Sequence, residues 1–325
     1  MATNKYHLEK TAPGEAWDRL VASSPNATVF SEGEYLAAIR QPYSLYFIYR
    51  AREIRGGLVV PESADREHAQ CNPLLVYSGV LFPHIAHNQN REQITSERFD
   101  LCEAVAEALP GLYTDVELAL SPGVNDIRPF LWYNYSGEGR HFIPGVRYTA
   151  EAPIAELAAT SMEESGLFAQ CATARRQELR YAVRHGVTTD EEYLPEQFTE
   201  FYALTMGRQG IAVSGEYKED MRHLLARLGK AGKARMFVSR TAKGATGSMA
   251  VMALDQYRAY YLFGANDPAL RDTHCGSAVI WDAFAALAKS GVRLVDMEGV
   301  NSPRRGWFKL SFGAILQTYY ELALR

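Results

Sequence analysis

The chain has 325 residues, about twice the ~150 residues of an ordinary domain, so two lobes with separate apolar cores are expected. Hydrophobic residues make up 47% and charged residues 22%, which excludes a largely disordered or collagen-like chain. With 34 Lys and Arg against 38 Asp and Glu, the net charge of −4 excludes a protein whose whole surface coats a polyanion.

The cysteines and the N-terminal segment indicate the compartment. Cys71, Cys102, Cys171 and Cys275 are scattered with no Cys-x-x-Cys, which argues against a disulfide framework or a zinc ribbon. Residues 1–10 contain no basic segment followed by an apolar one, and no uncharged apolar stretch reaches 18 residues. We therefore expect a cytoplasmic protein with no membrane span.

Two segments 190 residues apart repeat one pattern. Phe, Arg and Gly stand at 47, 50 and 57 and again at 237, 240 and 247, and both segments read as strand, turn and strand. The tripeptide Gly-Glu-Tyr also occurs twice, at 33–35 and at 215–217. This self-similarity predicts duplication of one α/β unit.

The boundary between the two copies is expected near residue 150. Residues 147–154, "RYTAEAPI", read as extended, and one long amphipathic pattern follows through Leu167, Cys171, Leu179 and Val183. The predicted domains are 1–150 and 151–315, and the last strand, 316–325, can return to the first lobe.

Periodicity and capping predict the remaining elements. Helices are expected at 31–39, 96–108, 195–209, 216–228, 276–289 and 306–312, and strands at 259–264, 292–298 and 318–324. The order strand, helix, strand between 259 and 298 predicts a crossover between parallel neighbours, whose carboxyl ends commonly bind ligands. The fold class is α/β.

Residues 259–314, "AYYLFGANDPALRDTHCGSAVIWDAFAALAKSGVRLVDMEGVNSPRRGWFKLSFGA", resemble the C-terminal half of the FemXAB-type and related GNAT-fold acyltransferases. "ARRQELRYAVRHGV" resembles the basic helix of that family, and "YSGVLFP" is weakly similar. The resemblance spans about 165 to 320 and implies two tandem GNAT-like lobes with mixed sheets. It also implies transfer of an acyl or aminoacyl group from an ester or thioester to an amine, with no metal, no ATP and no tightly bound cofactor.

Lys309 is the leading catalytic candidate. The Phe308-Lys309 pair matches the family's marker, and the resemblance implies that the ammonium stabilises negative charge on the reacting carbonyl oxygen. Trp307 and Phe308 would supply an apolar, substrate-binding wall on which such a charge acts more strongly. The alternative is a lysine that extends along the surface of its helix.

Two carboxylates and two tyrosines are further candidates. Asp296 and Glu298 are two residues apart on a predicted strand and would share one face, where either could accept the proton of the amine. The alternative is that they cap a loop or pair with Arg304 or Arg305, which are themselves substrate-binding candidates. Tyr260 and Tyr261 could hydrogen-bond the substrate, and strand alternation sends one of them into the core.

Acyl-CoA-dependent GNAT enzymes hold pyrophosphate with a Gln/Arg-x-x-Gly-x-Gly/Ala loop at a helix N-terminus. Residues 273–278, "THCGSA", keep the glycine and the final alanine but begin with Thr273. That departure weakens an acyl-CoA assignment, although backbone amides at Gly276 and Ser277 could still bind a phosphate.

Basic residues provide other candidate phosphate contacts. Arg176, Arg180 and Arg184 recur every four residues, which places them on one helical face, and residues 222–243 hold seven basic residues and no acid. Arg208 could bind an acceptor phosphate or carboxylate. The alternative for all of these is a solvated surface. His84 and His87 lack a third ligand, so no metal site is predicted.

The leading hypothesis is an amide-forming transferase that uses aminoacyl-tRNA and modifies an amine of a cell-wall precursor or peptide-like metabolite. This hypothesis includes tRNA as a possible partner, and no DNA partner is expected. Acyl-CoA as donor, and a lobe pair that binds a partner without catalysis, are the alternatives.

Overall fold

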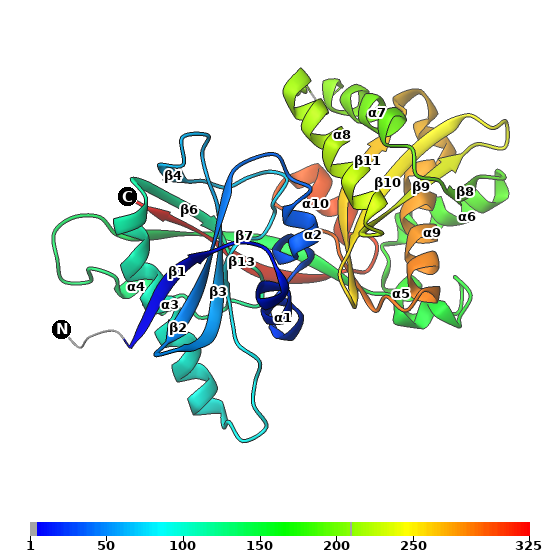
Figure 1. Cartoon of the computed structure of the whole chain (residues 1–325). Helices are drawn as coiled ribbons and strands as arrows, with labels where there is room; N and C mark the ends of the chain where they lie inside the picture. Colours follow the sequence, from blue (N-terminus) through cyan, green and yellow to red (C-terminus); the bar gives the residue numbers. More distant parts are fainter. Residues whose placement is uncertain (1–4, 209) are drawn as a thin grey trace. The chain divides into compact units, whose positions relative to one another are not determined.

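The computed structural model describes residues 5–208 and 210–325 (Figure 1). Contacts within the chain divide it into two compact units. One comprises Met1–Arg147 and Thr318–Arg325, and the other comprises Tyr148–Gln317. Strands β7 (Phe142–Pro153) and β13 (Ile315–Leu324) carry the chain from each unit into the other.

The first unit contains a four-stranded antiparallel sheet in the order β1-β2-β3-β5 and a second group of strands in which β6 pairs with β4 and with the end of β13. Its long helix α3 carries Leu101, Val105 and Leu109 into the apolar core of this unit. The elements are β1 (Tyr6–Thr11), α1 (Glu15–Ser23), η1 (Val29–Ser31), α2 (Gly33–Leu36), β2 (Tyr43–Arg50), β3 (Glu53–Pro61), β4 (His68–Ala69), β5 (Gly79–Leu81), α3 (Arg91–Leu112), β6 (Asp115–Ala119) and α4 (Arg128–Trp132).

The second unit contains a mixed sheet in the order β7-β12-β11-β10-β9-β8. Helices α7 and α8 lie on one side of it and α9 on the other (Figure 1). The elements are η2 (Ala155–Ala158), α5 (Gly166–Gln170), α6 (Thr173–Arg184), β8 (Thr188–Glu191), α7 (Pro195–Gly207), α8 (Gly215–Lys230), β9 (Ala234–Arg240), β10 (Thr246–Leu254), β11 (Arg258–Asn266), η3 (Pro268–Thr273), α9 (Cys275–Lys289), β12 (Leu294–Asp296) and α10 (Pro303–Leu310).

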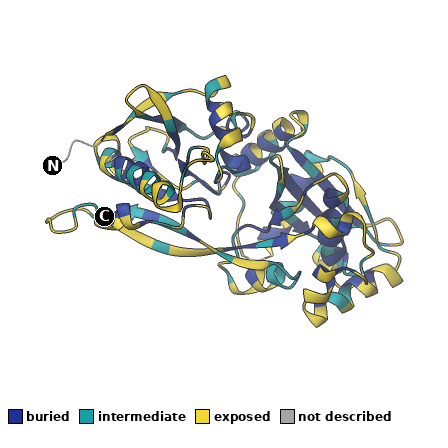
Figure 2. Cartoon of the chain, turned by 90° about the horizontal axis from the view of Figure 1, so that it is seen from below, coloured by how far each residue is buried: buried dark blue, intermediate teal, exposed yellow. Residues whose placement is uncertain are grey.

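Helix α9 explains how the second unit is held together. Its residues Ile280, Phe284 and Leu287 recur at helical spacing and are buried against the sheet. The strands of this sheet are mostly buried, whereas the outer helix surfaces are exposed (Figure 2). The parallel pairing of β11 with β12 on either side of α9 confirms the predicted crossover.

The repeated segments form equivalent elements in the two units. Strands β2 and β3 form an antiparallel hairpin, and so do β9 and β10. Each Gly-Glu-Tyr tripeptide begins a helix, α2 in the first unit and α8 in the second. The predicted strand, turn and strand pattern is therefore present in both places.

Three sequence-based expectations were wrong in detail. The long amphipathic segment is two helices, α5 and α6, because the chain is extended at Cys171 and Ala172 between them, and Val183 is exposed. The helix expected at 31–39 is reduced to η1 and α2. Tyr260 and Tyr261 are both buried, because helices cover both faces of the sheet.

No helix in the described part of the chain has the length and apolar character needed to cross a membrane. In those same residues, the group of side chains that could hold a metal ion is Asp65, Glu67 and His68, which does not include His84 or His87.

Candidate active site

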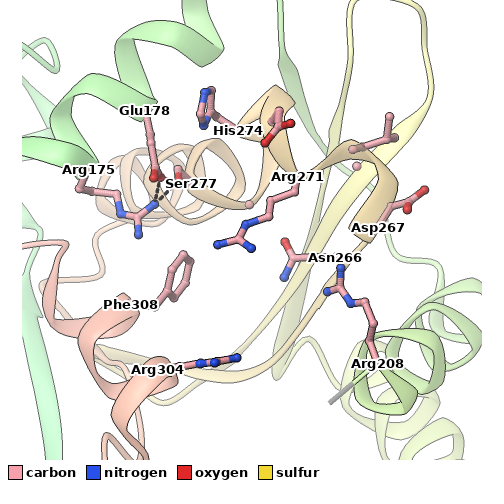
Figure 3. Close-up of a pocket in the computed structure, with 14 residues that line it drawn as sticks. Arg175, Glu178, Arg208, Asn266, Asp267, Arg271, His274, Ser277, Arg304 and Phe308 are labelled. Atoms are coloured by element: carbon pink, nitrogen blue, oxygen red, sulfur yellow. Dashed lines mark hydrogen bonds and ion pairs between the residues drawn. The ribbon is translucent and has the colours of Figure 1, made fainter. Parts of the chain in front are cut away.

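Four arginines from four elements line one cavity of about 580 Å³ in the second unit (Figure 3). They are Arg175 of α6, Arg208 at the end of α7, Arg271 of η3 and Arg304 of α10. Gly276, Ser277 and Phe308 also line this arginine cavity. Together with Arg208 and Arg304, they are five site residues that the sequence predicted and that the structure brings together. Such a concentration of guanidinium groups is suited to phosphate or carboxylate.

Arg175 is a fixed part of the cavity wall. Its guanidinium carbon lies 4.5 Å from the ring centre of Phe308 and 4.6 Å from that of Phe312, and its Nε donates a 2.9 Å hydrogen bond to Ser311. Its Nη1 contacts both Glu178 and Ser277. Arg175 was not predicted, because the four-residue spacing of Arg176, Arg180 and Arg184 marks a different face of α6. The buried Leu179 and Ala182 could have indicated the face on which Arg175 lies.

The N-terminus of α9 forms another wall of the cavity. His274 precedes the helix with a positive φ of 63°, which turns the chain sharply after η3. A Cβ added to Gly276 would lie 2.6 Å from Oδ1 of Asn266, an atom that also accepts a hydrogen bond from Ser248. Glycine therefore lets the first turn of α9 approach β11 closely. Arg271, which was also not predicted, stands two residues before Thr273, where the loop segment 273–278 begins.

The half-buried Lys309 and the buried Glu298 form a charged cluster in the same unit. The Lys309 Nζ lies 5.5 Å from the ring centre of Tyr261 and donates a 3.2 Å hydrogen bond to the Gly299 carbonyl. Glu298 is 7% exposed, and its Oε1 is buried with no hydrogen-bond partner among the described residues. An unsatisfied buried carboxylate oxygen is costly, which marks this position for explanation.

Burial changes the proton affinity of this cluster. It raises the pKa of Glu298 well above 4.5, although the nearby Lys309 ammonium opposes the change. Burial also lowers the pKa of Lys309 below 10.5, against the attraction of Glu298. The two groups therefore titrate as a pair, with pKa values closer together than those of an exposed glutamate and lysine.

The backbone at Glu298 differs from the expectation. Strand β12 ends at Asp296, so Glu298 lies beyond it and does not share a strand face with Asp296. The Asp296 carboxylate accepts hydrogen bonds from the Thr149 hydroxyl and from the Glu298 backbone N–H, at 2.7 Å for the latter. Glu298 has a φ of 53°, a conformation that costs energy for a residue with a side chain. Asp296 thus positions the turn that carries Glu298.

Several predicted residues lie elsewhere. The Tyr260 hydroxyl donates to Asp255, 2.6 Å away, at the start of β11. Trp307 is 74% exposed, and Arg305 donates to the Ser302 hydroxyl at 3.2 Å. None of these three lines the arginine cavity.

Several residues of the predicted basic surfaces pair with acids. Arg180 contacts both carboxylate oxygens of Glu163, and Arg176 lies beside Thr173 and outside the arginine cavity. In the basic run, Arg235 pairs with Glu191 and Arg240 with Glu192. Glu191 ends β8 and Glu192 follows it, about 45 positions before the arginines that they contact. The composition of the basic run therefore could not reveal these acidic partners.

Residues 169–303 match the family model described as the acetyltransferase (GNAT) domain. The match covers 135 of the 325 residues and lies within the second unit. It contains Arg175, Arg208, Arg271 and the N-terminus of α9, and it ends just before Arg304 and Lys309. No curated protein matches the chain.

Solved structures resemble the chain over nearly its full length. FemX has a TM-score of 0.62 at 14% identity, with 96% of each chain covered. A tandem GNAT protein from the clavulanic acid biosynthesis pathway has a TM-score of 0.58 at 13% identity, with 98% of each chain covered. L-PGS from Bacillus licheniformis has a TM-score of 0.53 at 12% identity, covering 97% of this chain and 93% of that one. At these identities the likeness shows the fold, which is two tandem GNAT-like lobes.

Proposed function

We propose that this protein forms an amide by moving an aminoacyl or acyl group from a phosphate-bearing donor to an amine. The observation that carries the proposal is the arginine cavity at the N-terminus of α9, in the same unit as the Lys309 and Glu298 cluster. The cavity would bind the donor's phosphate, since helix N-termini and guanidinium groups both favour anions. Phe308 joins the two places, because it lines the cavity and directly precedes Lys309.

The proposed reaction is aminolysis. The neutral amine attacks the carbonyl carbon, the C–N bond forms, and the bond from that carbon to the donor oxygen or sulfur breaks. The Lys309 ammonium stabilises the negative charge on the carbonyl oxygen, and Glu298 accepts a proton from the attacking nitrogen. That proton then passes to the departing hydroxyl or thiol, so Glu298 returns to its starting form. The raised pKa of Glu298 suits it to this exchange.

Aminoacyl-tRNA is the donor that we favour. Thr273 stands where acyl-CoA-dependent GNAT enzymes have Gln or Arg, and FemX and L-PGS share the fold. The basic run at 222–243 adds little support, because its Arg235 and Arg240 already contact acids.

Acyl-CoA is the second candidate donor. The first turn of α9 does face the arginine cavity, as a pyrophosphate-binding loop would require, and Arg271 supplies a cation close to it. For either donor, we propose as acceptor an amine of a cell-wall precursor or a small peptide-like metabolite, as the sequence resemblance implies.

Donor binding and transfer test the proposal together. The purified protein would be incubated with charged tRNA, acetyl-CoA and longer acyl-CoAs, and both thermal stability and amide formation would be followed. A ligand at about 100 times its Kd adds about 2.7 kcal/mol to stability. Stabilisation and amide formation with charged tRNA support the favoured donor, and the same results with an acyl-CoA support the alternative. Binding with no transfer to any amine would support a lobe pair that only binds.

A further inference from the structure

Three aromatic side chains gather at one edge of the arginine cavity. Tyr181 lies near the end of α6, His185 follows that helix, and His274 precedes α9 and lines the cavity. Figure 3 shows His274 at the opposite edge of the cavity from Arg304 of α10. We call Tyr181, His185 and His274 the ring platform.

The rings of the platform face in nearly the same direction. Their centres are 5.7 Å apart for Tyr181 and His274, 6.1 Å for Tyr181 and His185, and 6.5 Å for the two histidines, with interplanar angles of 24°, 19° and 19°. The three similar distances place the ring centres at the corners of a triangle, and the ring planes lie within 24° of one another.

The platform does not belong to the core. Tyr181 is 40% exposed and His185 is exposed, whereas the apolar core of this unit takes Leu179 from the same helix. The Arg184 guanidinium carbon lies 4.5 Å from the ring centre of Tyr181, which holds that ring in place and adds positive charge beside it. An exposed group of parallel rings next to a phosphate-binding cavity has the chemistry of a nucleobase site.

We propose that the ring platform stacks a nucleobase of the donor whose phosphate occupies the arginine cavity. The inference rests on the proposed function, because it identifies the part of the donor that this surface binds. It orders the donor along the domain, with the base on the platform, the phosphate among the arginines and the acyl group toward α10. The base belongs either to a terminal nucleotide of tRNA or to the adenosine of coenzyme A, since both carry a base next to phosphate.

The test measures binding of three probes by titration calorimetry. Pyrophosphate supplies phosphate alone, adenosine 3′,5′-bisphosphate supplies the nucleotide end of coenzyme A, and the trinucleotide CCA supplies the end of tRNA. Stacking of one base contributes about 5- to 150-fold in affinity, so at least one nucleotide probe should bind ~10-fold or more tightly than pyrophosphate.

Tyr181→Ala should remove most of that advantage and leave pyrophosphate binding within about 2-fold, because it removes a ring and no phosphate contact. Tyr181→Phe keeps the ring and should retain the advantage. Val183→Ala is the matched control, since Val183 is 68% exposed on the same helix and lies outside the platform. The probe that depends on Tyr181 identifies the source of the base.

The outcomes separate the two proposals. If pyrophosphate binds but neither nucleotide binds more tightly, the platform does not stack a base, and the donor cavity stands. An equal loss of pyrophosphate and nucleotide binding in Tyr181→Ala also overturns the inference. If no probe binds the unaltered protein, the phosphate-binding cavity fails and the inference fails with it.

Discussion

The Lys309 ammonium donates a 3.2 Å hydrogen bond to the backbone carbonyl of Gly299. Gly299 directly follows Glu298, whose φ of 53° turns the chain after β12. The helix that carries Lys309 is thereby tied to the turn that carries Glu298. The geometry of the cation and that of the carboxylate depend on each other, so both belong to one candidate catalytic unit.

Lys309→Ala should lower turnover by ~10²-fold or more, which is typical for loss of one group that stabilises a carbonyl oxyanion. Lys289→Ala is the matched control, because Lys289 also lies in the last turn of a helix and is exposed. Steady-state kinetics with a saturating donor measure the effect. Near-normal turnover in Lys309→Ala would remove this residue from the mechanism.

The pH dependence of turnover should reflect the Glu298 and Lys309 pair. The Glu298 carboxylate must be ionised to accept a proton, and its pKa is raised above 4.5. Turnover should therefore rise with pH along an acidic limb whose midpoint lies above pH 4.5. Lys309 must be protonated, and its pKa is lowered below 10.5. Turnover should therefore fall as the pH rises along a basic limb whose midpoint lies below pH 10.5. Both limbs are macroscopic properties of the pair.

Glu298→Gln should reduce the rate and shift the acidic limb relative to the unaltered protein. Both proteins would be assayed with the same acceptor, so the ionisation of the acceptor amine is common to the two profiles. Superimposable profiles with equal rates would exclude Glu298 as the proton acceptor.

Arg271→Ala should raise the KM for the donor about 10-fold with a smaller change in kcat, because Arg271 faces the arginine cavity and is proposed to bind phosphate in the ground state and the transition state alike. The effect should shrink as salt concentration rises. Arg180→Ala serves as control, since Arg180 pairs with Glu163 outside the cavity. If Arg180→Ala has the larger effect, the donor phosphate lies on the exposed face of α6.

Phe312→Ala should destabilise the protein by about 3–5 kcal/mol, because Phe312 is fully buried and packs against Phe284 and the Arg175 guanidinium. Trp307→Ala, in a side chain that is 74% exposed, should change stability by less than about 0.5 kcal/mol. Urea unfolding measures both. A Trp307→Ala protein of normal stability but higher acceptor KM would support the substrate role that the sequence suggested for this residue.

Part of the candidate site could be predicted because it is encoded locally. Gly276 and Ser277 stand at a helix N-terminus that periodicity locates, and Phe308 and Lys309 form a short recognisable pair. The spacing of Arg176 and Arg180 was equally visible, but it reports only that the side chains share a helix face. Which face of α6 is buried depends on its packing against α9 and on the contact with Phe308 of α10, and that packing selects Arg175.

By itself, the sequence determined a two-lobed α/β chain, the crossover around α9 and the candidates Lys309 and Glu298. Hydrophobic periodicity, turn residues and short motifs carry that information along neighbouring positions. Only the tertiary structure decided that Arg175, Arg208, Arg271 and Arg304 share one cavity and that Glu298 has a left-handed backbone. The four arginines come from four elements spread over about 130 positions of the sequence. Only the packing of these elements within the second unit brings their charges together.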